Sequence, residues 1–379
     1  MEAPVAITGM GCVTAFGDTP DRLWDRLIVG DCAARPWDDL AQQGFRVAVA
    51  CRIADFEAPA DRRAERLGIA AATAALGDAA PPPGARLGVL LGSTMGESGC
   101  FESAAEQGVP VPARDGSVAA LTAGVAAALG APVVARSYGN ACAAGNTAIG
   151  AAVSLLRRGV VDVAVAGGVD GFSRIAMAGF VRSRAMTPDL CRPFDAGRAG
   201  MQLAEGAAFL VLERTADARA RGADIVAGVH GTGLSCDAFH PTAPAPGGEG
   251  MMIAMRRSLA LAGAAPADLA FISAHGSGTV ASDAAEALAI AGIAGDVPVA
   301  GWKGALGHAM GAASAIEAVI SALALRRGRL PGTTNNRAPD PSMRINLVRA
   351  PQTLSGGRFA LSNAFGFGGI NSALLLEAA

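Results

Sequence analysis

Cys142 lies in a run of small residues, YGNACAAGN, directly before a segment with the apolar spacing of a helix. Basic side chains at Arg157 and Arg158 suit the end of that helix, and Gly159 stops it. At a helix N-terminus, unpaired backbone N–H groups and the positive end of the dipole favour a thiolate over a thiol. The small neighbours leave room for a bulky thioester, so the segment predicts a nucleophile that holds an acyl group. A buried structural cysteine in a helix-packing seam is the alternative.

Two of the four histidines lie in glycine-rich turns between an apolar strand and a helix. His275 lies in AHGSGT, and His308 lies in GALGHAMG, with Lys303 five residues before it. Side chains at strand ends often carry the chemistry of open α/β sheets. Either histidine alone would more simply be a surface residue or one satisfied by hydrogen bonds. Together with Cys142, the two histidines predict a shared active site.

The segments that must position these residues alternate between strand and helix patterns. The stretch 86–92 (RLGVLLG) is apolar on both faces, which predicts a buried strand in a parallel or mixed sheet with helices on each side. The polar stretch 100–115 is interpreted as surface, and the turn-rich stretch 170–201 as a loop that builds the site. We expect further strands at 5–8, 132–136, 160–166, 209–212 and 225–229, and helices at 19–29, 65–76, 118–129, 216–221 and 314–328.

The chain shows signs of an internal duplication. Residues 225–237 repeat the strand-to-glycine pattern of residues 5–18, and SAIEAVISALALRRG at 314–328 is similar to NTAIGAAVSLLRRG at 146–159. Two similar α/β halves, 1–223 and 224–379, would meet at a crevice, where binding sites commonly form. Chance similarity between alanine-rich helices is the alternative.

Composition narrows the class of protein. The 379 residues are 51% hydrophobic and 17% charged, so most elements should be buried. A net charge of −2 without a basic block argues against nucleic acid as a partner. No stretch approaches the roughly eighteen apolar residues of a membrane helix, and no basic leader precedes the first apolar run, so we expect a cytoplasmic protein. The seven scattered cysteines form no Cys-x-x-Cys pair, which argues against a zinc site and a disulfide framework.

Four motifs in order, ACAAG, AHGSGT, KGALGHAMGAA and NAFGFGGINSALLLE, make the chain resemble the β-ketoacyl-[acyl carrier protein] synthase family of the thiolase superfamily, in its elongating Cys-His-His branch. The resemblance covers nearly the whole chain. It implies the thiolase fold, in which two similar α/β halves pack as a five-layer αβαβα sandwich. It also implies decarboxylative Claisen condensation of an acyl primer, held on the cysteine, with malonyl-[acyl carrier protein], in fatty-acid or type II polyketide or polyene synthesis.

The resemblance assigns roles to the motif residues. Cys142 is the acyl-accepting nucleophile, and the backbone N–H groups of Cys142 and Phe367 form an oxyanion hole. His275 and His308 donate hydrogen bonds to the enolate oxygen that forms on decarboxylation. Lys303 is implied to set the local charge and hydrogen bonding, and Glu317 is implied to support Lys303. Ser277 and Thr279 are implied to line the pantetheine tunnel. The gating loop is implied to contain Phe365, Phe367 and Gly368.

The implied partners are an acyl carrier protein and a second ketosynthase chain. The second chain is another copy in a homodimer, or a ketosynthase-like partner in a heterodimer. The resemblance implies no organic cofactor and no metal.

Some features depart from the family pattern. The cysteine context YGNACAAGN differs from the common Thr-Ala-Cys form, Ser277 stands where threonine is usual, and AEGAAF lacks a usual glycine. The chain also looks shorter than typical members, chiefly between Gly92 and Cys142, where part of the dimer contact and acyl pocket is built. These departures leave the acyl chain length and the pathway open.

Other relatives of the same fold fit the motifs less well. A thiolase would need a second cysteine in the C-terminal active-site loop, and an initiating synthase carries asparagine where His308 stands. A non-elongating chain-length partner usually lacks the cysteine, whereas Cys142, His275 and His308 are all present. The motifs therefore favour an elongating synthase, with the chain-length partner as the alternative.

Overall fold

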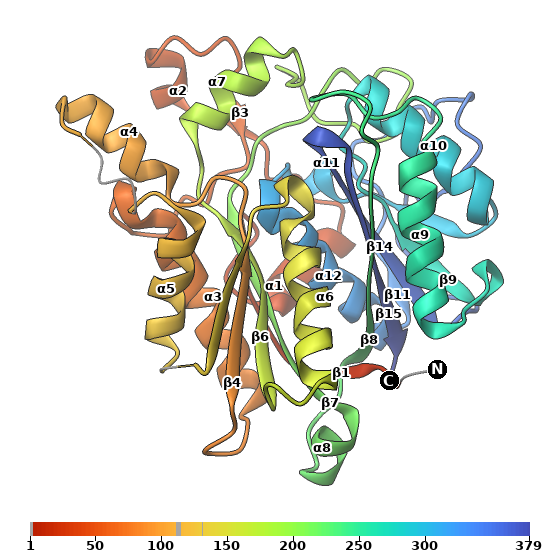
Figure 1. Cartoon of the computed structure of the whole chain (residues 1–379). Coiled ribbons are helices and arrows are strands. Elements are labelled where there is room, and N and C mark those ends of the chain that lie inside the picture. The colour runs from red at the N-terminus through yellow and green to blue at the C-terminus, as the bar shows by residue number, and fades with distance from the viewer. Residues whose placement is uncertain (1–2, 111–114, 131) are drawn as a thin grey trace.

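The structure is a computed structural model that describes residues 3–110, 115–130 and 132–379 (Figure 1). Within these residues, eleven strands form one mixed sheet in the order β12-β10-β9-β14-β15-β8-β1-β7-β6-β4-β5. The strands are β1 (Val5–Val13), β4 (Leu87–Gly92), β5 (Val134–Tyr138), β6 (Val163–Asp170), β7 (Gly206–Arg214), β8 (Ala227–Cys236), β9 (Leu269–Ser273), β10 (Pro298–Ala300), β12 (Asn346–Leu347), β14 (Phe359–Gly366) and β15 (Ile370–Ala378). Two short ladders lie apart from it, β2 (Arg35–Pro36) with β3 (Val49–Ala50) and β11 (Arg329–Leu330) with β13 (Gln352–Thr353).

The sheet repeats the same strand arrangement on both sides of its centre. One half runs outward as β1, β7, β6, β4 and β5, and the other as β8, β15, β14, β9 and β10. In each half the first two strand pairings are antiparallel and the next two are parallel. β1 pairs with β8 antiparallel at the centre. This is the arrangement that a duplicated α/β unit predicts, while the boundary between residues 223 and 224 stays a prediction.

Alternate residues of the strands face two different helix layers. In β6, Val163 packs with α3 (Arg63–Ala79) and α5 (Val118–Ala128), whereas Ala164 belongs to the core around α6 (Ala144–Arg157) and α12 (Met310–Arg327). On the other half of the sheet, α9 (Glu249–Ala262) and α10 (Val280–Ala294) cover the outer face. The layers therefore run α3/α5, the β1 half of the sheet, α6/α12, the β8 half of the sheet and α9/α10, which is the predicted five-layer sandwich (Figure 1).

Helices α6 and α12 form the central layer because their side chains are small. Every residue of α12 from Met310 to Leu325 is buried, and most are alanine, glycine or serine. A Cβ on Gly145 of α6 would lie 2.9 Å from the backbone nitrogen of Ala315, so the two helices cross with their backbones nearly in contact. This crossing brings together the N-terminal ends of both helices, and each end follows one of the motif loops.

The remaining helices are shorter, and none of the described helices is long and apolar enough to cross a membrane. They are α1 (Pro20–Ile28), α2 (Asp38–Gln42), α4 (Ser98–Gln107), α7 (Arg174–Arg182), α8 (Thr215–Ala220) and α11 (Lys303–Leu306), with 3₁₀ turns at Ala60–Arg62, Ala141–Ala143, Pro266–Asp268 and Phe367–Gly369.

The structure corrects one interpretation of a polar stretch, because residues 174–182, within the expected loop 170–201, form the helix α7. Residues 98–107 form the helix α4, which lies largely at the surface, as the sequence suggests for residues 100–110. The two helices are tied together by an ion pair between Arg174 Nε and Glu102 Oε2 at 2.7 Å. Such tertiary contacts, unlike apolar spacing, leave no pattern in the sequence. The part of the 100–115 interpretation that concerns residues 111–114 lies outside the described residues.

Candidate active site

Cys142 lies in the 3₁₀ turn Ala141–Ala143 that leads into α6. Ala141 has a φ of +48°, a left-handed conformation that a residue with a side chain adopts only when its surroundings hold it there. Burial raises the pKa of the Cys142 thiol to about 12, although the charge of Lys303 opposes the shift. Burial therefore favours the thiol over the thiolate that the sequence predicts at this position.

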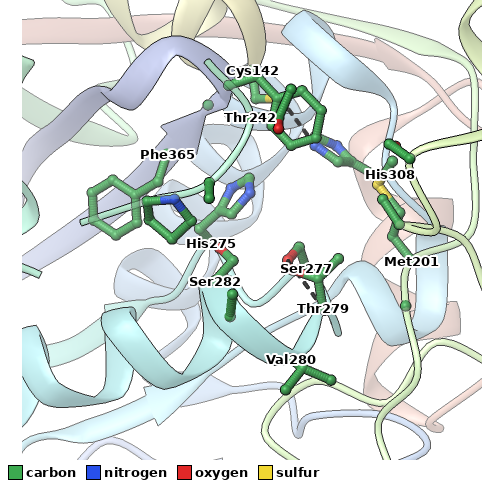
Figure 2. Close-up of a pocket in the computed structure, with 18 of the residues that line it drawn as sticks. Cys142, Met201, Thr242, His275, Ser277, Thr279, Val280, Ser282, His308 and Phe365 are labelled. Carbon is green, nitrogen blue, oxygen red and sulfur yellow. Dashed lines mark hydrogen bonds between the residues drawn. The ribbon is translucent and has the colours of Figure 1, made fainter. Parts of the chain in front are cut away.

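His308 contacts Cys142 directly. Its Nε2 lies 3.1 Å from Sγ of Cys142, and Figure 2 shows the two side chains meeting at one end of the pocket. The backbone of His308 is held on both sides, because its N–H donates to the carbonyl of Gln202 and its carbonyl accepts from the N–H of Ala204. Burial, reinforced by the charge of Lys303, holds the pKa of His308 well below its usual value. The imidazole is therefore neutral near pH 7 and can accept or donate a proton at Nε2.

His275 faces His308 across the pocket. The ring centroids are 5.3 Å apart and the ring planes are at 79° (Figure 2). Glu286 fixes the loop, because its carboxylate accepts hydrogen bonds from the backbone N–H groups of His275 and Gly276, each at 2.8 Å. Burial, with the charge of Lys303, also holds the pKa of His275 well below its usual value. Two neutral imidazoles thus present ring nitrogens to the same space.

Lys303 and Glu317 form a buried ion pair behind the histidines. Nζ of Lys303 donates to Oε1 of Glu317 and to the backbone carbonyl of His275, each at 2.6 Å. Burial raises the pKa of the Glu317 carboxyl to about 7, against the opposing effect of Lys303. These two contacts hold the ammonium in place, and its charge acts on Cys142 and on both histidines.

The glycine-rich loop after β14 lies against Cys142. A Cβ on Gly366 would be 3.2 Å from the backbone nitrogen of Cys142, so a side chain here would have to push its neighbours aside by a few tenths of an ångström. Gly368 has a φ of +81°, which again suits glycine. The ring of Phe367 is half-exposed and packs on Phe180 of α7, with the centroids 5.4 Å apart.

Side chains from these loops line one cavity of about 290 Å³. Cys142, His275 and His308 lie on its wall, and Ser277 and Thr279 lie along the same wall, their hydroxyl oxygens 2.9 Å apart (Figure 2). Phe365 is buried beside His275, whereas Lys303 and Glu317 stay behind the wall. Within the described residues, no cluster of His, Cys, Asp or Glu side chains is arranged to hold a metal ion.

Comparison with known proteins shows the family of the chain. The chain matches the family models "Beta-ketoacyl synthase, N-terminal domain" over residues 2–218 and "Beta-ketoacyl synthase, C-terminal domain" over residues 226–337. The chain belongs to the β-ketoacyl synthase family. It is 36% identical to 3-oxoacyl-[acyl-carrier-protein] synthase 2 of Rhizobium meliloti (strain 1021), with 98% of each chain covered.

Solved structures agree with this β-ketoacyl synthase assignment. The ishigamide ketosynthase/chain length factor is 38% identical with a TM-score of 0.93, and each chain is fully covered. A type II polyketide ketosynthase in complex with its acyl-carrier protein is 25% identical with a TM-score of 0.92, again over both full chains. The predictions of a thiolase fold and of an acyltransferase of the β-ketoacyl synthase type are confirmed. The alignment to the Rhizobium enzyme spans 419 positions against 379 residues here, as expected for a shortened chain.

Sequence reasoning missed two carboxylates that position this β-ketoacyl synthase site. Glu286 holds the His275 loop, as described above. Asp170, at the end of β6, accepts hydrogen bonds from the backbone N–H groups of Met95 at 2.8 Å and Gly311 at 2.7 Å, and so joins the first half of the chain to the start of α12. Both residues are fully buried. An acidic residue within an otherwise apolar segment was the available signal, because a buried carboxylate must find donors.

Proposed function

We propose that the protein condenses an acyl group held on Cys142 with malonyl-[acyl carrier protein], with loss of carbon dioxide, to give β-ketoacyl-[acyl carrier protein]. The single observation that carries this proposal is the contact of His308 Nε2 with Cys142 Sγ in a cavity that His275 also lines. The alternative, a chain-length partner without elongation activity, is disfavoured by this intact arrangement.

Acyl loading begins with a thiol, because burial keeps Cys142 protonated. As the sulfur attacks the acyl thioester, neutral His308 accepts the thiol proton at Nε2 and passes it to the departing pantetheine sulfur. The backbone N–H groups of Cys142 and Phe367 stabilise the tetrahedral oxyanion. The role of His308 in this step extends the sequence-based assignment, which gave both histidines the enolate alone.

Condensation requires the same imidazole to act as a donor. Malonyl-thioester loses carbon dioxide, and N–H groups of His275 and His308 stabilise the enolate oxygen until the enolate carbon attacks the acyl group. Nδ1 of His308 is buried without a hydrogen-bond partner among the described residues, so no neighbour locks one tautomer. The Nε2 atom is thus free to accept a proton in one step and to donate in the next. Lys303 and Glu317 hold the local charge, and Ser277 and Thr279 line the path of the pantetheine arm.

The partners follow from the same reasoning. An acyl carrier protein delivers both substrates, as in the solved ketosynthase complex that the chain resembles. A second ketosynthase chain adds to the sheet at β5, which is the last strand and has an exposed central segment at residues 135–137. Cytoplasmic location belongs to the same proposal. Light scattering should give about twice the mass of the 37.6 kDa chain for a homodimer; a monomer that gains activity only with a ketosynthase-like partner would establish the heterodimer.

The test of the reaction is direct. The purified protein is incubated with acyl carrier proteins that bear acyl chains of different lengths, then with malonyl-[acyl carrier protein], and protein masses are recorded after each step. The expected result is an acyl adduct on Cys142 that disappears as a carrier-bound β-ketoacyl product forms. Absence of both adduct and product with every chain length, in the presence of candidate partner chains, would reject the proposal.

A further inference from the structure

The first turn of α7 is held by a carboxylate from another helix. Oε1 of Glu102, in α4, accepts hydrogen bonds from the backbone N–H groups of Arg174 at 2.8 Å and Ile175 at 3.3 Å. It also accepts from Oγ of Ser173 at 3.2 Å, and that hydroxyl oxygen accepts from the N–H of Ala176. The N–H groups of a first turn have no partner within their own helix, so Glu102 supplies an acceptor that α7 itself lacks.

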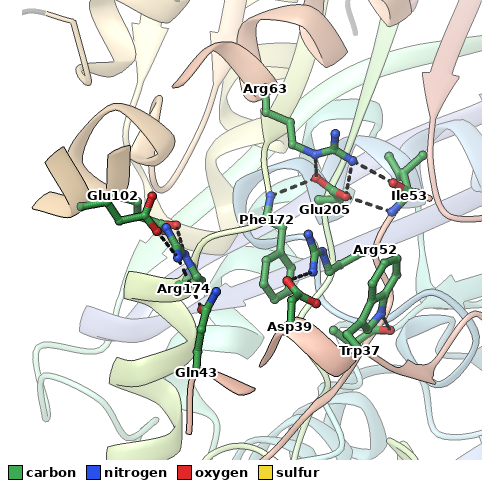
Figure 3. A network of polar contacts seen from close by, with 12 residues as sticks. Trp37, Asp39, Gln43, Arg52, Ile53, Arg63, Glu102, Phe172, Arg174 and Glu205 are labelled. Carbon is green, nitrogen blue, oxygen red and sulfur yellow. Dashed lines mark hydrogen bonds and ion pairs between the residues drawn. The ribbon is translucent and has the colours of Figure 1, made fainter. Parts of the chain in front are cut away.

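The side chain of Arg174 adds a second link between α4 and α7. Its Nε donates to Oε2 of Glu102 at 2.7 Å, and its Nη1 donates to Oε1 of Glu106 at 2.6 Å. Figure 3 shows this arginine reaching Glu102 and, at 3.4 Å, Gln43. The Glu102 side chain is 11% exposed and that of Glu106 is 61% exposed. Because solvent weakens exposed pairs, Glu102 makes the principal link.

The chain just before α7 is fixed by a different carboxylate. Glu205 accepts from the backbone N–H of Phe172 at 3.1 Å, and Arg63 holds Glu205 by contacts of 2.6 and 2.8 Å (Figure 3). The guanidinium of Arg52 lies over the ring of Phe172, 4.8 Å from its centroid. Glu205 thus fixes the backbone at Phe172, and Glu102 fixes the helical turn that follows.

The other end of α7 forms part of the wall of the acyl cavity. Phe180 lines that cavity and lies six residues after Arg174, about 9 Å along the helix axis. Its ring packs on Phe367, with the centroids 5.4 Å apart. Just beyond the helix, the carbonyl of Ala185 accepts from the N–H of Met201 at 2.8 Å. The helix therefore spans the distance from α4 to an aromatic contact in the cavity wall.

The loop that carries Phe367 also lies against the proposed nucleophile. A Cβ on Gly366 would be 3.2 Å from the backbone nitrogen of Cys142. The ring contact between Phe180 and Phe367 joins this loop to α7. A shift of α7 is therefore transmitted to the loop beside Cys142 through the two rings.

We propose that Glu102 is a positioning residue for acyl loading. From α4 it fixes the first turn of α7, and α7 in turn holds Phe180 against Phe367 in the loop beside Cys142. Glu102 does not line the acyl cavity, so it acts through Phe180. The position of α7 rests on the structure alone, and its effect on acyl loading rests on the proposed function.

The proposal is tested with the matched variants Glu102→Ala and Glu106→Ala. Both carboxylates pair with Arg174, but among the described residues Glu102 alone of the two also accepts from backbone N–H groups of α7. Glu102→Ala should slow acyl loading of Cys142 by about two- to tenfold, the factor that one aromatic contact provides. Glu106→Ala should load at the wild-type rate. Equal loading rates in the two variants would overturn the proposal.

A double variant separates positioning from a general loss of stability. If Glu102 acts through Phe180, Glu102→Ala should cause no further loss of loading in a Phe180→Ala background. Losses that multiply in the double variant would mean that Glu102 acts by another path, and would overturn the proposal. If Glu102→Ala fails to fold, as judged by thermal unfolding, Glu102→Gln takes its place beside Glu106→Gln, with a smaller loss expected in the same direction.

Alkylation of Cys142 by iodoacetamide gives a second readout, which needs no carrier protein. Phe180 and Phe367 line the cavity that holds Cys142, so loosening this wall should raise the alkylation rate. The expected rise is about two- to tenfold in Glu102→Ala, with no change in Glu106→Ala. An unchanged rate in Glu102→Ala would contradict the role of Glu102 in holding α7.

The fully buried Cys191 serves as an internal control for that measurement. It should stay unreactive in every variant, and its alkylation in Glu102→Ala would reveal a merely structural role for Glu102. A wild-type protein that takes up no acyl group from any carrier protein would instead reject the proposed function, and the alkylation comparison would still stand.

Discussion

Nε2 of His308 lies 3.1 Å from Sγ of Cys142, although the two residues are 166 positions apart. They begin the two helices of the central layer, α12 and α6, and each sits in the turn just before its helix. The contact joins the two similar halves of the chain at a single reactive atom. The proposed reaction, in which one half supplies the nucleophile and the other the histidines, depends on this contact.

The first prediction concerns the nucleophile. Cys142→Ala should carry no acyl mass after incubation with acyl-[acyl carrier protein], because no other group in the cavity is assigned to hold the acyl group. Intact-protein mass spectrometry measures the adduct, and Cys236→Ala is the control, because Cys236 is the exposed cysteine among the described residues. Acylation that persists in Cys142→Ala would place the nucleophile elsewhere.

The two histidines should differ in their effects on the two steps. His275→Ala should still load the acyl group, since His275 makes no hydrogen bond to Cys142, but should lose about a hundred- to a thousandfold in malonyl decarboxylation. His308→Ala should slow both loading and decarboxylation, because His308 also contacts Sγ. The rates are measured separately by adduct mass and by release of carbon dioxide. Identical behaviour of the two variants would contradict this division.

The buried ion pair should make each partner costly to remove alone. Lys303→Met leaves the Glu317 carboxylate unpaired in the core, and such a change typically lowers the free energy of unfolding by about 3–5 kcal/mol. The double variant Lys303→Met/Glu317→Leu should be more stable than Lys303→Met, because no unpaired charge remains. Urea unfolding of the wild type and both variants measures the difference. A double variant less stable than the single one would show that packing, and not charge pairing, dominates.

The reactivity of Cys142 should rise steeply with pH. Because burial raises the pKa of this thiol to about 12, the thiol form dominates at neutral pH and the thiolate fraction grows about tenfold per pH unit. Alkylation by iodoacetamide, followed at the Cys142 peptide, should therefore keep increasing from about pH 7 to pH 10. A plateau below about pH 9 would mean that the helix N-terminus stabilises the thiolate more than burial opposes it.

The loop against Cys142 should tolerate no added side chain. In Gly366→Ala the new Cβ would lie 3.0 Å from Cβ of Ala141 and 3.2 Å from the backbone nitrogen of Cys142. The displaced loop would withdraw the Phe367 N–H from the oxyanion hole, so acyl loading should fall by about a hundredfold or more. Gly356→Ala, in open space on another loop, is the control. Normal loading in Gly366→Ala would separate this loop from the oxyanion hole.

The sequence by itself determined which residues meet. Cys142, His275 and His308 each stand in a small-residue turn before a helix, and such local patterns are fixed by backbone geometry and apolar spacing. The repeated helix endings also predicted two similar halves, because the same pattern of buried positions produces the same unit twice. Polar stretches were harder to interpret, since α4 and α7 are joined by a contact between Glu102 and Arg174.

Only the tertiary structure decided the charge state of these residues and the contacts that distant segments of the chain make around them. The sequence favoured a thiolate at Cys142 from its helix end, but the folded chain buries the sulfur, and desolvation reverses that preference. The hydrogen bond from Lys303 to the carbonyl of His275 and the clamp on Gly311 by Asp170 likewise arise where distant segments pack. Burial and contacts across many residues depend on how whole layers fit together, and no local pattern encodes that fit.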